Sequence, residues 1–353
     1  MYIHYRFARL PSDKTLLNAL NAAALRVLHK LKAADSATLV GGDPYGKKDL
    51  DRLLVNLERK HLPNLAYHLA WALTGSKKPT KDVVLVDHGG GLGIAGLLAK
   101  ELGVGTVIYN DLSPEFLESA RSIAKHAGCP SDYYILGDVD CLISAFARLA
   151  LPRPDVLLSY NVLEHISDLD AFFQRLASSP CRPRAFLTSS GANMFNPWNV
   201  LQILPRQANV NVVFAAKRVE IIEKSAPTLS AAEVGMLARK SRLLIRSQIE
   251  EVVRHYVAEK KISLPRSYGA NASDPFGSNT VSPESGWWEE HFVNPYYLSG
   301  LLKKLGFRAR VLPGYYGRKG AFLNPIIAAL GAPLALAIAS FYTIEASDAA
   351  KEP

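Results

Sequence analysis

The sequence has few cysteines, and they are not arranged as a framework. Its 353 residues include only Cys129, Cys141 and Cys181, and no pair of them has the C-x-x-C spacing. This excludes a disulfide framework and a structural zinc site of the usual spacing, and it favours a reducing, cytoplasmic location. No uninterrupted apolar segment follows the basic residues Arg6 and Arg9, so we do not expect a secretory signal peptide.

Blocks of like charge are also missing. The chain has 41 Lys and Arg against 32 Asp and Glu, a formal net charge of +9, and these residues are spread along the sequence. One interpretation is an acidic partner such as nucleic acid, an anionic lipid surface or a phosphorylated substrate. A solvated surface is the other interpretation, and the even spread favours it. With 48% hydrophobic residues and a length above that of one typical domain, the chain can bury a large core.

A good membrane-spanning helix is lacking as well. The strongest membrane signal is the apolar stretch 321–339, which has nineteen residues and contains Pro325 and Pro333. We expect a buried or interfacial helical hairpin there instead. Three roles stay open for it: core packing, contact with a membrane surface or a lipid-linked substrate, and an oligomer contact. The oligomeric state itself is not predicted.

The chain is organised around residues 83–121. An apolar, β-branched run at 83–86 leads to Asp87, and an apolar-periodic stretch follows at 94–102, which predicts a strand, a tight turn and a helix. The turn contains the glycines Gly89, Gly90, Gly91 and Gly93. A main chain without Cβ atoms can turn tightly and lie against a ligand, while the next helix presents free N–H groups. We therefore expect a nucleoside ligand here.

The spacing alone does not say which nucleoside binds. Gly91, Gly93 and Gly96 satisfy G-x-G-x-x-G, and Asp111 follows Gly91 by twenty residues, as in NAD-dependent dehydrogenases. However, Asp87 lies directly before the loop, where its carboxylate would repel a pyrophosphate. The same carboxylate would pair with the amino group of a methionine moiety, so a cationic ligand is favoured.

Two further predicted strands end in polar side chains. Residues 134–139 predict a third strand that ends at Asp138, which can accept a hydrogen bond from an adenine amino group. Residues 155–160 predict a fourth strand, followed by the sequence NVLEH at 161–165. Ligands of open α/β sheets bind at the carboxyl ends of the strands. Asp87, Asp111 and Asp138 are therefore expected at one edge of the sheet.

In this order the motifs resemble those of class I S-adenosylmethionine-dependent methyltransferases. The matching stretches are VDHGGGLG for the glycine-rich motif, YNDLS with SAR for the ribose motif, GDVD for the adenine motif and DVLLSYNVLEH for the fourth strand. They cover residues 83–165, and a helix at 294–307 that ends in Gly-Phe extends the resemblance to the last strands. The resemblance implies an α/β, Rossmann-like methyltransferase sheet of seven strands, six parallel and one antiparallel.

The resemblance also implies S-adenosylmethionine as the cofactor, and methyl transfer from a sulfonium requires no metal. Asp111 would hold the ribose hydroxyls, Asp138 the adenine amino group, and Asp87 with the glycine loop the methionine end. The expected cofactor-binding residues are Asp87, Gly89, Gly91, Gly93, Asp111, Leu112, Asp138, Val139 and Asn161. His88 departs from the family pattern, which often has a small residue at this position.

We predict four parts along the chain. Residues 1–80 form an N-terminal helical extension or cap, 81–190 the cofactor-binding core, 191–293 a substrate-side insert after the fifth strand, and 294–353 the C-terminal part of the core with the apolar insertion. In the extension, helices begin at the caps Ser12 or Asp13 and near Lys48, and residues 41–46 form a connector or a flap over the cofactor.

The insert is expected to be helical and then rich in loops. We predict a helix from Asn199 and a long helical segment over 230–260, with Ser230 as its start signal. Residues 266–292 are rich in Gly, Pro, Ser and Asn, with interspersed aromatic residues at Tyr268, Phe276, Trp287 and Trp288. Such a loop suits a polar, ring-containing substrate. The alternative is that its tryptophans pack the insert onto the core.

The chemistry follows from the cofactor. A sulfonium methyl is already electrophilic, so the protein mainly aligns a nucleophile and, for a hydroxyl, removes its proton. His165 is the first candidate for this base, with an ordinary pKa of ~6.5 for its side-chain type. Glu164 and His291 are further candidates. A structural role is the alternative for each, since a lone histidine is more often structural.

Together these features predict a cytoplasmic methyltransferase with a small or medium-sized acceptor. The loop chemistry favours a hydroxyl oxygen of a sugar-like or other small molecule. A nucleic-acid methyltransferase is the nearest alternative, motivated by the net charge, but no N/D-P-P-Y/F-like motif follows the fourth strand. A NAD-dependent dehydrogenase and a non-catalytic, cofactor-binding scaffold protein are the remaining alternatives.

Overall fold

The computed structural model describes residues 13–33, 39, 50–51, 54–55, 57–166, 168–264, 280–284, 291–314 and 318–349. Contacts divide the chain into two compact units. Unit 1 comprises Met1–Val162, Asp170–Gly191 and Leu298–Pro353, and unit 2 comprises Leu163–Leu169 and Ala192–Tyr297. The finer four-part division into extension, core, insert and C-terminal part remains a proposal.

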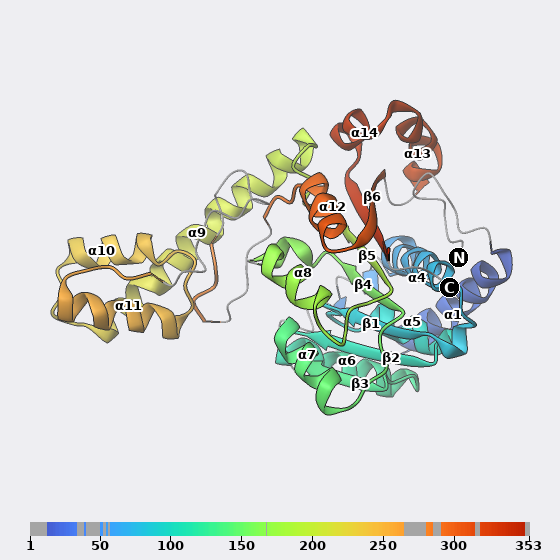
Figure 1. Ribbon diagram of the computed structural model, residues 1–353, viewed down its shortest axis with the longest axis horizontal. Coiled ribbons are helices and arrows are strands. Elements are labelled where there is room, and N and C mark those ends of the chain that lie inside the picture. Colours follow the sequence, from blue (N-terminus) through green and yellow to red (C-terminus); the bar gives the residue numbers. More distant parts are fainter. Residues whose placement is uncertain are drawn as a thin grey trace. The chain divides into compact units, whose positions relative to one another are not determined.

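Unit 1 is built on a seven-stranded sheet with the order β3-β2-β1-β4-β5-β7-β6 (Figure 1). The strands are β1 (Val84–His88), β2 (Thr106–Asp111), β3 (Tyr133–Leu136), β4 (Val156–Tyr160), β5 (Ala185–Ser190), β6 (Phe307–Gly314) and β7 (Phe341–Asp348). β7 pairs antiparallel with both β5 and β6, and the other pairs are parallel. The predicted Rossmann-like sheet of six parallel strands and one antiparallel strand is confirmed.

Helices of unit 1 cover both faces of this sheet. They are α1 (Lys14–Lys32), α4 (Leu62–Ser76), α5 (Ile94–Leu102), α6 (Pro114–Ala127), α7 (Val139–Arg148), α8 (Leu169–Ala177), α12 (Pro295–Lys304), α13 (Arg318–Leu330) and α14 (Ala332–Ile338), with short turns at Leu57–His61 and Thr80–Asp82. Beside the sheet, α1 contacts α4, α5 and α6, and α5 contacts α4 and α6 (Figure 1). The predicted cap Asp13 begins α1, because its side chain accepts from the Leu16 N–H at 3.0 Å.

The alternation of side chains along the strands sets which residues share a face. Leu85 of β1, Val107 of β2 and Leu187 of β5 belong to the large core that includes residues of α1, α4 and α5. Phe186, the neighbour of Leu187, points the other way and packs against Phe173 of α8. Side chains of a strand alternate between the two faces, so Asp87 lies on the same face as Leu85. Tyr109 and Asp111 likewise lie on the same face as Val107, which is the face that packs against α5.

The third strand is shorter than predicted. We expected it to run through Asp138, but β3 ends at Leu136 and Gly137 has φ +118°. The carboxylate of Asp138 instead caps α7, because it accepts from the N–H groups of Asp140 and Cys141 at 3.0 and 3.1 Å. A capping aspartate directly after a glycine is a helix start, and this local preference overrides the apolar run before it.

Unit 2 is helical, with α9 (Pro197–Ser225), α10 (Ala231–Lys240), α11 (Arg246–Glu259) and the turn Leu163–His165. The single long helix expected over 230–260 is wrong, since residues 241–245 separate α10 from α11. Its predicted start is confirmed: Ser230 and Glu233 form a capping box. α11 starts afresh because the Gln248 side chain accepts from the extended Ile245 N–H. These helices bury a core of their own around Ile222, Leu237 and Ile249.

The apolar segment 321–339 forms the helices α13 and α14, which contact each other and β6. Part of the pair is buried, including Ile327, Leu336 and Ala339, but Phe322 and Leu334 are 79% and 61% exposed. Among the described residues, the structure has no helix of the length and apolarity needed to cross a membrane. The predicted connector at 41–46 lies outside the described residues. So do the four aromatic residues of the predicted loop 266–292, namely Tyr268, Phe276, Trp287 and Trp288.

Candidate functional site

The glycine loop joins β1 to α5 and adopts backbone conformations that require glycine. Gly89, Gly91 and Gly93 have φ values of +65°, +52° and +72°, in the left-handed region that side chains disfavour. A Cβ atom at Gly89 would also lie 2.3 Å from the Val162 side chain, which follows β4. At Gly91, by contrast, no atom lies within 4 Å of an added Cβ. The space beside the Gly91 Cα, where a side chain would stand, is therefore open to a ligand.

Asp87 is a buried carboxylate beside this loop. It is 4% exposed, and its Oδ2 accepts from the Gly96 N–H in the first turn of α5 at 3.0 Å. Burial raises the pKa of Asp87 to about 7; the Gly96 hydrogen bond opposes this rise, and the charge of Asp111 adds to it. A group that is costly to ionise alone would gain from a cation placed next to it.

Asp111 ends β2 and is hydrogen-bonded on both oxygens. Its Oδ2 accepts from the Gly91 N–H at 2.8 Å, and its Oδ1 accepts from the Ser113 N–H at 2.9 Å. Burial raises the pKa of Asp111 although these N–H groups favour the charged form. Leu112, the next residue, is 49% exposed and offers an apolar surface beside the carboxylate.

Sequence reasoning missed Asn110, which connects three strand ends. Its Nδ2 donates to the carbonyls of Ile135 and Gly137 at 3.0 and 2.9 Å, so its Oδ1 is left to accept from His88 Nδ1 at 2.7 Å. The ring of His88 also lies against Phe172 of α8, with centroids 5.1 Å apart. This pairing explains the bulky residue at position 88. The signal in the sequence was the Asn-Asp pair at the end of the second strand.

Asp138, Val139 and Asn161 complete the predicted cofactor set on unit 1. Asp138 lies at the start of α7, and Val139 is buried in its first turn. Asn161 directly follows β4 with φ +55°, an uncommon value for a side-chain-bearing residue. Its N–H donates to the Ser189 carbonyl at 2.7 Å, and its Oδ1 accepts from the Gly191 N–H at 3.2 Å. This turn holds the ends of β4 and β5 together.

The three candidate bases all lie in unit 2. His291 is fully buried, and its main-chain N–H donates to the Glu164 carbonyl at 3.1 Å. The pKa of His291 is lowered to about 3, mainly by burial and in smaller part by the nearby charge of His165, while the hydrogen bond to Glu164 opposes the change. The Glu164 side chain is buried too, whereas His165 is half-buried. Of the three, His165 is therefore the most accessible to solvent or substrate.

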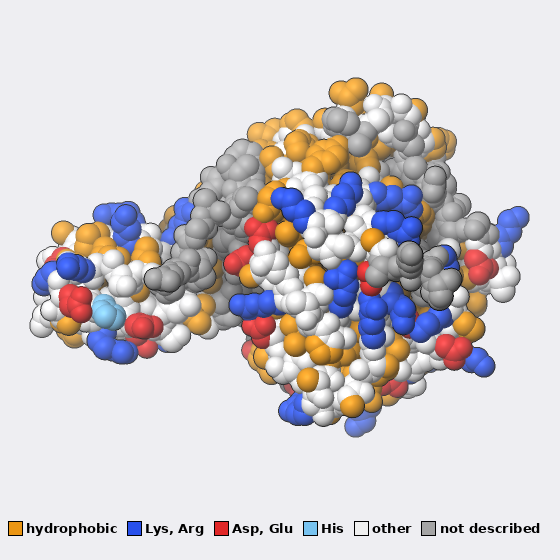
Figure 2. Space-filling view, in the orientation of Figure 1, with side chains coloured by type: hydrophobic (Ala, Val, Ile, Leu, Met, Phe, Trp, Pro, Cys, Tyr) orange, Lys and Arg blue, Asp and Glu red, His pale blue; other side chains and the backbone are white. Residues whose placement is uncertain are grey.

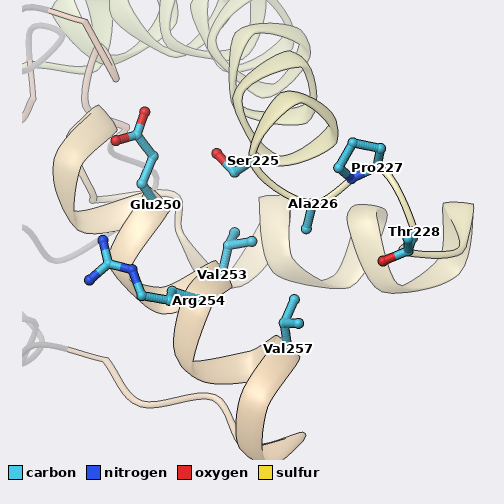
Figure 3. Close-up of a pocket in the computed structure, with 8 residues that line it drawn as sticks. All are labelled: Ser225, Ala226, Pro227, Thr228, Glu250, Val253, Arg254 and Val257. Carbon is cyan, nitrogen blue, oxygen red and sulfur yellow. The ribbon is translucent and has the colours of Figure 1, made fainter.

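Unit 2 also has a groove, of about 510 Å³, between α11 and the turn after α9 (Figure 3). Val253 and Val257 of α11 face this turn, while the charged ends of Glu250 and Arg254 lie at its side (Figure 3). None of the predicted site residues lines it. In the part of the chain that the structure describes, no group of three or more His, Cys, Asp or Glu side chains is placed to hold a metal ion.

Comparison with known families identifies the type of domain. Residues 86–179, from β1 to just beyond α8, match the family model described as a methyltransferase domain. Together with the sheet order and the glycine loop, this match shows that the chain contains a class I S-adenosylmethionine-dependent methyltransferase domain, whose cofactor is S-adenosylmethionine. The open main chain at Gly91 and the carboxylates of Asp87 and Asp111 fit a cationic nucleoside of this kind.

Individual relatives are distant. The ribosomal protein L11 methyltransferase of Hydrogenovibrio crunogenus is 25% identical over 130 residues, which cover 32% of this chain and 43% of the relative. The chain thus matches less than half of that protein. Similar solved structures include a magnesium protoporphyrin IX methyltransferase from Synechocystis PCC 6803 with bound SAH (12% identity, 85% and 87% coverage, TM-score 0.39) and an S-adenosylmethionine dependent methyltransferase from Mesorhizobium loti (16% identity, 79% and 97% coverage, TM-score 0.40).

We predict that Asp87 titrates near neutral pH and that Asp111→Asn lowers its pKa, because a like charge is removed. Carboxyl-carbon NMR of the ligand-free protein measures both values. Since the folded pKa exceeds the unfolded value of 3.8, the free energy of unfolding should fall as pH rises from about 4 to 7, by at most ~4 kcal/mol. Asp87→Asn should remove this part of the pH dependence. A titration midpoint near 4 for Asp87 would contradict the assignment.

Proposed function

We propose that this protein, in the cytoplasm, transfers the methyl group of S-adenosylmethionine to a hydroxyl oxygen of a sugar-like or other small or medium-sized molecule. The observation that supports the donor half is the pair of carboxylates, Asp87 and Asp111, on either side of an open glycine loop. The acceptor half rests on the composition of residues 266–292, and the location on the three cysteines, all of which are free thiols.

Each cofactor residue has a proposed role. Asp111 would bind the ribose hydroxyls and Asp138 the adenine amino group, with Leu112 and Val139 as apolar neighbours. Asp87 would pair with the methionine ammonium, which makes ionisation of this buried carboxyl favourable. Gly89, Gly91 and Gly93 would give main-chain access, and Asn161 would shape the turn beside them.

For the transfer itself, the bound cofactor supplies an electrophilic methyl group. The chain must hold an acceptor hydroxyl and take its proton, and His165 is our proposed base. A pKa of about 3 makes His291 a weak base, so we assign it a supporting role, with Glu164 as its main-chain partner.

A lipid-linked acceptor or a membrane surface is a second proposed partner, supported by the exposed apolar residues of α13 and α14. β6 runs parallel to β5, and Gly314 at its end lies opposite Phe341, next to the Ser190–Tyr342 pair. The hairpin therefore follows the carboxyl edge of the sheet, where the cofactor loops of unit 1 also lie. Its outward side includes Phe322, Ile326 and Leu334.

A nucleic-acid acceptor is retained as the alternative because of the charge distribution. Unit 2 has 12 Lys and Arg and 12 Asp and Glu, so unit 1, with 29 against 20, has the whole net charge of +9. Figure 2 shows Lys and Arg side chains gathered over the region where Figure 1 labels β1, β4 and β5. Such a surface would bind phosphates in a salt-dependent way.

Calorimetric titration with S-adenosylmethionine, S-adenosylhomocysteine and NAD tests the donor half. We expect micromolar binding of the first two and none of NAD. Asp111→Ala should weaken binding at least ~10-fold, because two ribose hydrogen bonds to a charged group are lost. Asp132→Ala serves as the control. It removes a carboxylate that lies directly before β3 and pairs with Lys100. Binding of NAD but of neither S-adenosyl compound would contradict the methyltransferase proposal.

An acceptor screen that begins with sugars and phenols and includes nucleic acids tests the acceptor half. With the acceptor found, His165→Ala should lower kcat by ~100-fold or more and leave S-adenosylhomocysteine affinity unchanged, as expected for loss of a general base. His255→Ala on α11 is the control, because that histidine is exposed and lies beside Glu259. An unchanged kcat in His165→Ala would rule out its role as the base.

The role of α13 and α14 is tested with the double variant Phe322→Ser/Leu334→Ser. If the hairpin contacts lipid, the wild-type protein should co-sediment with anionic phosphatidylglycerol vesicles and the double variant should lose most of this binding. The exposed Val55→Ser, in the N-terminal part, controls for a general loss of apolar surface. Equal behaviour of wild type and double variant would exclude a membrane role for these side chains.

A further inference from the structure

Tyr109 is a fully buried tyrosine of β2 that the proposed chemistry leaves unexplained. It lies two residues before Asp111 and opposite Asp87 in the register of β1 and β2. Its hydroxyl donates to the Gly91 carbonyl at 2.6 Å. Burial raises the pKa of Tyr109 far above its ordinary value, so the hydroxyl keeps its proton and remains a donor at any pH the protein survives.

The Gly91 residue is therefore held at both of its main-chain polar groups. Its carbonyl accepts from Tyr109 Oη, and its N–H donates to Asp111 Oδ2 at 2.8 Å. We call these two hydrogen bonds the Gly91 anchor. Both partners come from β2 and lie on the same face of the sheet, so the strand itself sets the position of the loop. A loop with φ +52° at this residue would otherwise have many accessible conformations.

The ring of Tyr109 also explains why residue 90 of the loop is a glycine. Gly90 is not among the residues with positive φ, so its backbone does not require glycine. A Cβ atom at Gly90 would instead lie 2.6 Å from Tyr109 Cε2 and 3.0 Å from Asp87 Oδ2. A Cβ atom added at Gly93 would lie 3.7 Å from the same ring. The tyrosine thus fills the space beneath the loop, and Gly90 is the residue that makes room for it.

A bound ligand would affect the two hydrogen bonds of the Gly91 anchor differently. Asp111 is the proposed ribose partner, so ribose hydroxyls would share the carboxylate that now accepts from Gly91. The Tyr109 hydroxyl is buried under the loop and makes no proposed contact with the cofactor. Its bond to the carbonyl can persist whether or not a ligand is present, and it would keep the loop in shape while Asp111 turns to the ligand.

We propose that Tyr109 is a positioning residue for cofactor binding: its hydroxyl holds the Gly91 carbonyl and its ring supports Gly90, so that the glycine loop is preformed for S-adenosylmethionine. This inference rests on the proposed function. The tyrosine acts through the loop and is not a catalytic residue, so it should affect the affinity for the cofactor and not the chemical step.

Tyr109→Phe tests the hydrogen bond because it keeps the ring. We expect the Kd of S-adenosylhomocysteine to rise about 3- to 10-fold, the loss of one buried hydrogen bond. The KM for S-adenosylmethionine should rise in parallel with an unchanged kcat. Tyr134→Phe is the matched control: its ring packs on Tyr109 with centroids 5.5 Å apart, but its hydroxyl accepts from the Ser131 N–H outside the loop. This control should bind as the wild type does.

A double-mutant cycle tests the ring. Gly90→Ala should weaken binding by ~10-fold or more, since its Cβ meets the ring of Tyr109. The double variant Gly90→Ala/Tyr109→Leu should bind more tightly than Gly90→Ala, because the colliding ring is gone. The contact with Asp87 Oδ2 remains, so recovery is expected to be partial. A double variant that is no better than Gly90→Ala would overturn the role of the ring.

Amide hydrogen exchange at Gly91 in the ligand-free protein separates this proposal from the proposed function. In Tyr109→Phe the Gly91 N–H should exchange faster, while amides in the middle of β1 and β2 keep their protection. If the wild type binds no S-adenosylhomocysteine, the proposed methyltransferase function is contradicted. The Gly91 anchor is then tested only by comparing the Gly91 exchange rates of the wild type and Tyr109→Phe. If the wild type binds and Tyr109→Phe matches it in affinity and in Gly91 exchange, the anchor is refuted.

Discussion

The position of the glycine loop depends on two carboxylates bonded to backbone N–H groups, the buried Asp87 and the half-buried Asp111. Asp87 accepts from Gly96, and Asp111 accepts from Gly91 and Ser113. Without these donors, each carboxylate would cost several kcal/mol to bury. The arrangement therefore does two things at once: it fixes the loop to α5 and to β2, and it keeps Asp87 desolvated where the ammonium group of a cationic nucleoside would neutralise it.

Neighbouring strand ends are adapted to the same loop. Val162 after β4 approaches Gly89 so closely that no Cβ fits, and Asn110 connects the ends of β1, β2 and β3. His88, placed against Phe172, lets α8 pack on the face opposite Asp87. Because interiors are close-packed, a change in one of these side chains would be transmitted to the others. His88, which departs from the common family pattern, is accommodated by Asn110 and Phe172, and the ring of Tyr109 is accommodated by Gly90.

Sequence reasoning identified most of the fold, because apolar runs bounded by glycine or capping residues fix the strands and helices locally. The first four strands, the cap at Asp13 and the helix start at Ser230 followed from such signals, whereas the complete seven-stranded sheet followed from the resemblance to methyltransferases. It failed where a local cap overrides a pattern: Asp138 starts α7 instead of ending β3, and residues 241–245 break the helical period. The Asn-Asp pair at the end of the second strand marked Asn110 as polar, but the roles of Asn110 and Tyr109 could not be predicted, since they depend on which strands are neighbours. The spacing of Asp87 and Asp111 suggested a site, but not that Gly91 connects to Asp111.

The distribution of charge across the sheet gives these acids a further reason to lie where they do. Asp87, Asp111 and Asp138 all lie at carboxyl ends of strands and accept from N–H groups at or near the starts of helices α5, α6 and α7. The positive ends of those helix dipoles stabilise the negative charge. At the amino ends the order is reversed: the buried Asp155 pairs with Lys78 and Arg184, and Asp348 pairs with Arg153 and Arg182. Each carboxylate there is shared by two cations, so the amino edge keeps a positive excess. Within unit 1 the three acids of the candidate cofactor site thus lie at the carboxyl edge, whereas these carboxylates with two cations each lie at the amino edge.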